Sequence, residues 1–74
     1  MTLVEIAQIY TDLVRLDDQT PTEEYQTKDR INALRTKYHQ MLMDKMREES
    51  IYFSDRFDAT QKAFEIIHKE KAHS

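Results

Sequence analysis

Apolar side chains recur at intervals of three and four residues over three stretches of this chain, and this spacing places them on one face of an α-helix. The first set comprises Leu3, Ile6, Ala7, Tyr10, Leu13 and Val14. The second comprises Ile31, Leu34, Tyr38, Met41 and Leu42, and the third comprises Phe53, Phe57, Thr60, Phe64 and Ile67, with Ala63 and Ile66 beside them. The pattern predicts three amphipathic helices.

The first predicted helix spans about residues 2–16. Thr2 and Glu5 have the spacing of a capping box, in which each side chain binds the backbone amide of the other residue. Asp17 and Asp18 would oppose the helix dipole at its C-terminal end, so we expect the helix to stop near Leu16.

Ile9 and Leu16 lie just beside the first apolar stripe, which is therefore wider than one neighbouring helix can cover. One explanation is that this helix lies between two neighbours in a three-helix core, and this is the explanation we favour. The other is that Ile9 and Leu16 belong to an exposed docking surface.

The second predicted helix spans about residues 21–48 and follows a turn at Thr20-Pro21. Thr20 has the position of an N-cap, Pro21 that of the first helical residue, and Glu23 that of the third. At 1.5 Å per residue this helix would be about 42 Å long, against about 22 Å for the first. The C-terminal segment or a second molecule must cover the difference.

The third predicted helix spans about residues 52–70 and is followed by a frayed tail at 71–74, with its three phenylalanines expected in the core. Its start is the least defined boundary, because Ser50 and Ser54 are both suitable caps. A continuous helix from Pro21 to about Lys69 is the alternative, and it would need an intermolecular antiparallel partner. We favour the broken version, since helices are usually short.

These elements predict an all-α fold, a short antiparallel bundle of two to three helices forming one domain over residues 1–74. The absence of glycine and the single proline agree with it, because strand hairpins depend on tight turns. A core of this size rarely supplies more than about 3–5 kcal/mol, and no cysteine is present to form a disulfide. Association with another molecule is therefore expected.

The charge composition argues against a nucleic-acid partner. The net charge is −3, with 14 acidic and 11 basic residues. Lys28, Arg35 and His39 share one helix face, but acids intervene, so we expect a solvated surface there. No stretch has the roughly 20 apolar residues of a membrane span, and we expect a soluble, cytoplasmic protein.

Candidate chemistry is sparse. Glu65 and His68 have the Glu-x-x-His spacing of carboxylate-bridged metal bundles, but the helical geometry directs Glu65 to solvent, so this pair is a weak metal candidate. No serine has a credibly spaced histidine and acid, and there is no glycine for a phosphate-binding loop. We expect neither an enzyme nor a bound cofactor.

The sequence favours a small non-catalytic helical module that binds another protein, as an adaptor, an inhibitor or regulator, or an accessory subunit, and that is a homodimer or a subunit of a complex. The candidate partner-binding residues are Ile9, Leu16, Met43, Met46, Ile51 and Tyr52. The alternative is a self-assembling structural helical hairpin. A metal-binding carboxylate and histidine protein is the third, less favoured hypothesis.

Overall fold

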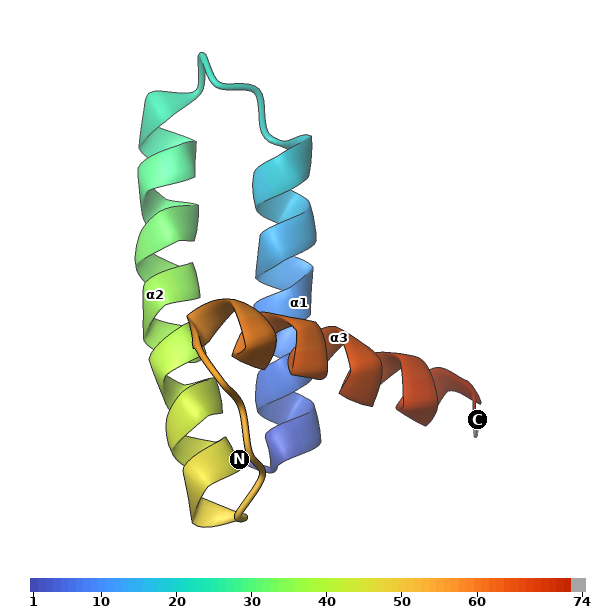
Figure 1. The fold of residues 1–74 in the computed structure, drawn as a ribbon. Helices are drawn as coiled ribbons and strands as arrows, with labels where there is room; N and C mark the ends of the chain where they lie inside the picture. Colours follow the sequence, from blue (N-terminus) through green and yellow to red (C-terminus); the bar gives the residue numbers. More distant parts are fainter. Residues whose placement is uncertain (73–74) are drawn as a thin grey trace.

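The computed structural model describes residues 1–72 and contains three helices over that range, α1 (Leu3–Gln19), α2 (Tyr25–Glu48) and α3 (Arg56–Ala72). Helices α1 and α2 form an antiparallel hairpin, and α3 crosses one side of it, with its C-terminal end projecting past α1 (Figure 1). The predicted all-α bundle is therefore confirmed, in its three-helix form.

The core lies where α3 crosses the hairpin. Its buried cluster comprises Leu3, Ile6, Ala7 and Tyr10 from α1, Leu42, Met43 and Met46 from α2, and Ala59, Ala63 and Ile67 from α3. The two alanines of α3 are fully buried and carry only a methyl group, so they allow the α3 backbone to lie close to the hairpin.

The N-terminus of α1 begins with the predicted capping box. The Thr2 hydroxyl accepts a hydrogen bond from the Glu5 amide at 3.1 Å, and the Glu5 carboxylate accepts one from the Thr2 amide at 2.8 Å. The predicted end at Leu16 is wrong, because α1 continues through both aspartates to Gln19. Cations from α2 bind Asp17 and offset its unfavourable position at the end of the helix.

The predicted start of α2 at Pro21 is also wrong, since α2 begins at Tyr25 and its flanking residue, Glu24, makes no side-chain capping bond. The Thr20 hydroxyl instead donates to the Leu16 carbonyl at 2.7 Å, so it serves the end of α1. The Glu24 amide donates to the Pro21 carbonyl at 3.1 Å within the connecting turn. Thr20 is therefore a C-terminal cap, and Pro21 lies in the loop.

A Schellman motif ends α2. The Ile51 amide donates to the Met46 carbonyl at 2.8 Å and the Ser50 amide to the Arg47 carbonyl at 3.1 Å, which satisfies two terminal carbonyls of the helix. Ser50 has a φ of 61°, in the left-handed region that this motif usually fills with glycine. The alternative prediction of one continuous helix from Pro21 to about Lys69 is therefore wrong.

Helix α3 begins at Arg56, four residues after the predicted start, and neither Ser50 nor Ser54 supplies its cap. The Asp55 carboxylate accepts a hydrogen bond from the Asp58 amide at 2.8 Å, and the Asp58 carboxylate accepts one from the Ser54 amide at 2.9 Å. At its other end α3 includes residues 71 and 72, which were predicted to fray. The rest of that predicted tail lies outside the described residues.

The face of α3 that packs is not the predicted phenylalanine stripe. Ala59, Ala63 and Ile67 are buried, whereas Phe57 is 70% exposed and Phe64 is half-buried. At 100° per residue, the buried face is turned by about 100° from the stripe. The prediction that Phe57 belongs to the core is therefore wrong.

Candidate functional site

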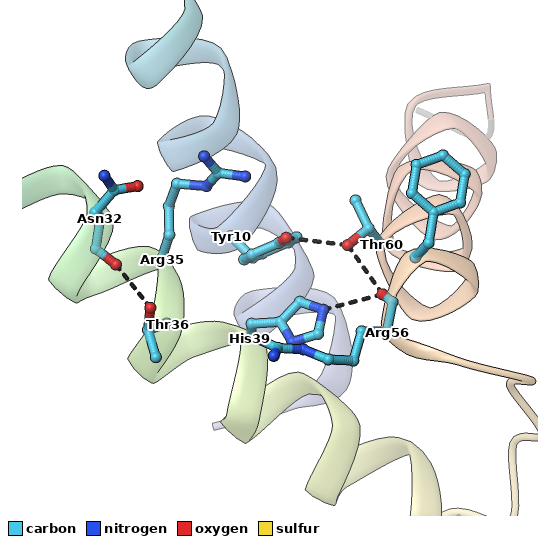
Figure 2. A pocket seen from close by; sticks show the side chains of 8 residues that line it. Tyr10, Asn32, Arg35, Thr36, His39, Arg56 and Thr60 are labelled. Atoms are coloured by element: carbon cyan, nitrogen blue, oxygen red, sulfur yellow. Dashed lines mark hydrogen bonds between the residues drawn. The ribbon is translucent and has the colours of Figure 1, made fainter. Parts of the chain in front are cut away.

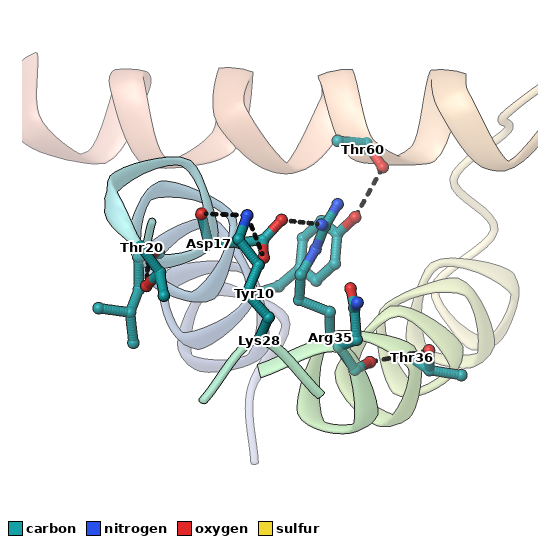
Figure 3. Close-up of polar contacts among 9 residues, drawn as sticks. Tyr10, Asp17, Thr20, Lys28, Arg35, Thr36 and Thr60 are labelled. Atoms are coloured by element: carbon teal, nitrogen blue, oxygen red, sulfur yellow. Dashed lines mark hydrogen bonds and ion pairs between the residues drawn. The ribbon is translucent and has the colours of Figure 1, made fainter. Parts of the chain in front are cut away.

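A polar clamp joins the two helices of the hairpin near the connecting turn (Figure 3). Arg35 Nη1 of α2 donates to the Asp17 carboxylate of α1 at 2.8 Å. Lys28 Nζ donates to the Asp17 backbone carbonyl at 3.0 Å and lies 3.5 Å from its carboxylate. The charges of Lys28 and Arg35 are paired, but with Asp17 of the other helix, and their side chains are only 26% and 32% exposed, so the predicted solvated surface is corrected to a half-buried one.

A pocket of about 350 Å³ lies where the three helices meet (Figure 2). It is lined by Tyr10, Asn32, Arg35, Thr36, His39, Arg56, Phe57 and Thr60. The Thr60 hydroxyl donates to the Arg56 carbonyl at 3.2 Å, so the Tyr10 hydroxyl, 3.0 Å from it, is the donor to Thr60. This pair links α1 to α3.

His39 connects α2 to the start of α3. Its Nε2 lies 3.1 Å from the Arg56 carbonyl, and because a carbonyl only accepts, Nε2 is the donor. Its ring packs against the Tyr10 ring, with the two ring centroids 5.2 Å apart. The histidine is buried, which corrects the expectation of a solvated surface there, and its side chain links α2 to the start of α3.

The metal candidates Glu65 and His68 are both exposed on α3. Within residues 1–72, no group of three or more His, Cys, Asp or Glu side chains is placed to hold a metal ion.

The predicted partner-binding residues fall into two groups. Met46 is fully buried in the core, which corrects its place in the predicted docking set, and Met43 is buried to 7% exposure. Ile51 is half-buried beside the core, and Tyr52 is 77% exposed. Ile51 and Tyr52 therefore lie at the junction between α2 and α3, where they line a pocket of about 390 Å³ together with Met43.

Ile9 and Leu16 lie on the side of the hairpin that α3 leaves uncovered. Tyr10 faces His39 across the hairpin, and Thr11, one residue later, is turned by about 100° and fully buried. Ile9, one residue earlier, is turned by about 100° the other way, so it points to the side of the hairpin opposite Thr11. Figures 1 and 3 show α3 on one side of the hairpin only.

Six apolar side chains occupy that uncovered side, and we refer to them as the open hairpin face. They are Ile9, Leu13 and Leu16 of α1 and Leu34, Tyr38 and Met41 of α2. Leu16 is 48% exposed and Leu34 is 44% exposed, and the other four are half-buried. The sequence pattern offers Ile9 and Leu16 as a docking surface only in the less favoured explanation, and it assigns Leu13 and the α2 half of this face to core stripes.

A second apolar surface lies on the outer side of α3. Phe57 and Phe64 line a shallow pocket of about 470 Å³ together with Thr60, Gln61 and Glu65. The Arg15 guanidinium lies 5.6 Å from the centre of the Phe64 ring and partly covers it. This surface comes from a single helix, whereas the open hairpin face draws on two.

Comparison with protein-family models, with curated protein sequences and with solved structures returned no match. None of the three helices within residues 1–72 combines the length and apolar character needed to cross a membrane.

Proposed function

We propose that this chain is a small non-catalytic helical module that binds another protein, as an adaptor, a regulator or inhibitor, or an accessory subunit of a complex. The observation that carries the proposal is the open hairpin face. On this face two adjacent helices present six apolar side chains, of which four are half-buried and two, Leu16 and Leu34, keep nearly half of their surface in water.

The size of the face supports this proposal. Helix α1 has 17 residues and is therefore about 25 Å long, and a helix pair is about 20 Å wide, so this side of the hairpin has a footprint of about 500 Å², which includes its charged edges and is an upper limit for the apolar area. The largest apolar patch on a monomer is typically about 300–600 Å² and often functional. At about 25 cal/mol per Å², covering such an area is a substantial driving force for association.

The face is also held in shape before any partner arrives. The clamp of Asp17, Lys28 and Arg35 fixes the two helices near the connecting turn, and the Tyr10 and His39 rings meet further along the hairpin. A preformed surface loses less conformational entropy on binding than one that must order itself.

The self-assembling structural hairpin is the second candidate function. It is favoured by the same face, because an apolar surface built from two antiparallel helices has the shape that another helical hairpin can pack against. The two candidates differ in what covers the face.

Site-specific photo-crosslinking tests the proposal. A photoreactive amino acid is placed at Leu16 or at Leu34 and the chain is expressed in its native cell. The control position is Asp29, which is exposed and lies about 140° around α2 from Leu34. We expect crosslinks to a defined protein from positions 16 and 34 and none from position 29. Equal labelling from all three positions, or none from any, contradicts the proposal.

The proposal also assigns the protein to the cytoplasm, as expected from its composition. Imaging of a fluorescent fusion in the native cell checks this assignment, and a signal confined to another compartment contradicts it.

A further inference from the structure

We infer that the occupant of the open hairpin face is a second copy of this chain, packed so that α1 of each copy lies antiparallel along α2 of the other. This inference rests on the proposed role of the open hairpin face in association, and it selects self-assembly, the second candidate function, as what covers the face. The two hairpins would then form the two layers of a four-helix bundle, with each copy's α3 on the outside.

The heights of residues along the hairpin determine which side chains would meet. Tyr10 lies level with His39, and Asp17 binds Arg35, so residues at one height have numbers that sum to about 50. A two-fold axis parallel to the helices keeps every residue at the same height along the hairpin, and it places α1 of one copy opposite α2 of the other.

Under that symmetry the apolar side chains of the face meet one another. Ile9 lies opposite Met41 of the second copy, and Leu16 lies opposite Leu34 of the second copy. Every such contact occurs twice, because the interface is isologous. The two most exposed leucines of the face therefore cover each other.

Charge supports the same arrangement. Along the outer edge of the face α1 carries Glu5 and Asp12. The neighbouring Arg15 lies 3.7 Å from Asp12 and 5.6 Å from the centre of the Phe64 ring. The corresponding edge of α2 carries Arg30 and Lys37 in its first two-thirds, and Asp44 and Glu48 nearer its C-terminal end. Asp12 and Lys37 have matching heights, so α1 against α2 sets acid opposite base.

The other two-fold arrangement is less favourable. An axis perpendicular to the helices would place α1 against α1 of the second copy, and the acidic edges would then face each other. Like charges across an interface disfavour an arrangement. Asp12 already lies 3.7 Å from Arg15, but an exposed pair of this kind contributes little and leaves the carboxylate available.

The area sets the expected affinity. About 500 Å² per copy corresponds to about 1,000 Å² buried in total, at the lower limit of specific interfaces. A weak dimer follows, with a dissociation constant on the order of micromolar.

Sedimentation of the purified full chain over a wide concentration range is the first measurement. We expect a monomer–dimer equilibrium. The Asp12→Lys and Lys37→Asp variants should each weaken it about tenfold, because two facing charge pairs become repulsive. An equimolar mixture of the two variants should form a heterodimer at least as tight as the parent, since its pairs are again of opposite sign. Asp18→Lys, an exposed residue away from the face, is the matched control and should have no effect.

Cysteine crosslinking tests the helix arrangement directly, because the chain contains no cysteine. Leu16→Cys mixed with Leu34→Cys should yield a mixed disulfide. Efficient Leu16→Cys self-crosslinking without the mixed product overturns the arrangement, and a strictly monomeric parent chain overturns the inference. If the parent is monomeric but positions 16 and 34 crosslink to a different protein in cells, the proposed function stands without this inference. If neither experiment finds a partner, both fail.

Discussion

The Asp17 carboxylate near the end of α1 accepts a 2.8 Å hydrogen bond from Arg35 Nη1 in the middle of α2. The aspartate side chain is only 16% exposed, so the bond is partly shielded from water. It holds together the half of the hairpin that lies furthest from the core, where α3 does not reach (Figure 1). The open hairpin face depends on this bond because Leu16 and Leu34 both lie in that half.

Replacing Asp17 with alanine should destabilise the fold by about 1–3 kcal/mol. The substitution leaves the Arg35 guanidinium partly buried without its acceptor, and its Nε already lacks a hydrogen-bond partner within residues 1–72. Chemical denaturation monitored by circular dichroism measures the effect. Asp18→Ala is the control, because the Asp18 side chain is exposed and should change stability by less than about 0.5 kcal/mol. Equal effects for the two variants would show that the clamp contributes nothing.

Ser50→Gly should stabilise the protein by about 0.5–1 kcal/mol. Ser50 occupies the left-handed conformation of the Schellman motif, which is unfavourable for residues with a Cβ and is readily adopted by glycine. Thermal unfolding detects the gain as a rise in Tm. Ser50→Val should lower Tm, since a β-branched residue tolerates this conformation poorly. A fall in Tm for the glycine variant would mean that the helix ends differently.

Low pH should loosen the N-termini of α1 and α3 before it unfolds the core. The Thr2 amide and hydroxyl hold the pKa of Glu5 below its ordinary value of 4.5, and the Ser54 amide holds that of Asp58 below 3.8. Because both pKa values are lowered in the folded protein, the two carboxylates contribute fully to stability at a pH above their ordinary pKa values. This contribution is lost as the pH falls through the folded pKa values.

NMR amide exchange across a pH titration measures this loosening at the two helix starts. Glu5→Gln is the matched control, because glutamine keeps a capping-box acceptor and cannot titrate. In the variant, protection of the amides at the start of α1 should no longer depend on pH once intrinsic exchange is allowed for. Protection at the start of α3 should keep its pH dependence. Identical pH profiles for the parent and the variant at Thr2 to Glu5 would contradict the assignment.

Phe57→Ser should leave stability within about 0.5 kcal/mol of the parent, because the ring is largely in water. Ala63→Leu should cost about 1–3 kcal/mol, since the fully buried methyl group lies at the α3 contact and the added atoms overpack it. Denaturant titration of both variants tests which face of α3 packs. The opposite ranking would restore the phenylalanine stripe as the core face.

The sequence predicted three helices and the α1 cap because these features depend on neighbouring residues. The Thr20-Pro21 start signal failed for a related reason. A threonine at that position can cap the helix before it or the helix after it, and here its hydroxyl binds the Leu16 carbonyl. Local spacing alone does not distinguish the two uses.

Long-range contacts account for the other differences. The partners of Asp17 lie 11 and 18 residues away, so its tolerance at a helix end had no local signal. On α3, periodicity identified two adjoining faces, and only packing against the hairpin selected the alanine face over the phenylalanines. His39 had a signal that was overlooked, since Arg35, His39, Leu42 and Met46 are spaced by four, three and four residues along one stripe of α2.

The most direct test of the open hairpin face is the doubly substituted chain, Leu16→Asp with Leu34→Asp, measured for helicity and for association. We expect a helical circular dichroism spectrum close to that of the parent and a Tm within a few degrees of it, together with loss of association and of the crosslinks at this face. Leu42→Asp, at a fully buried position, should unfold the chain and shows what substitution of a core residue does. If the double variant unfolds as Leu42→Asp does, the two leucines belong to the core and the account is contradicted.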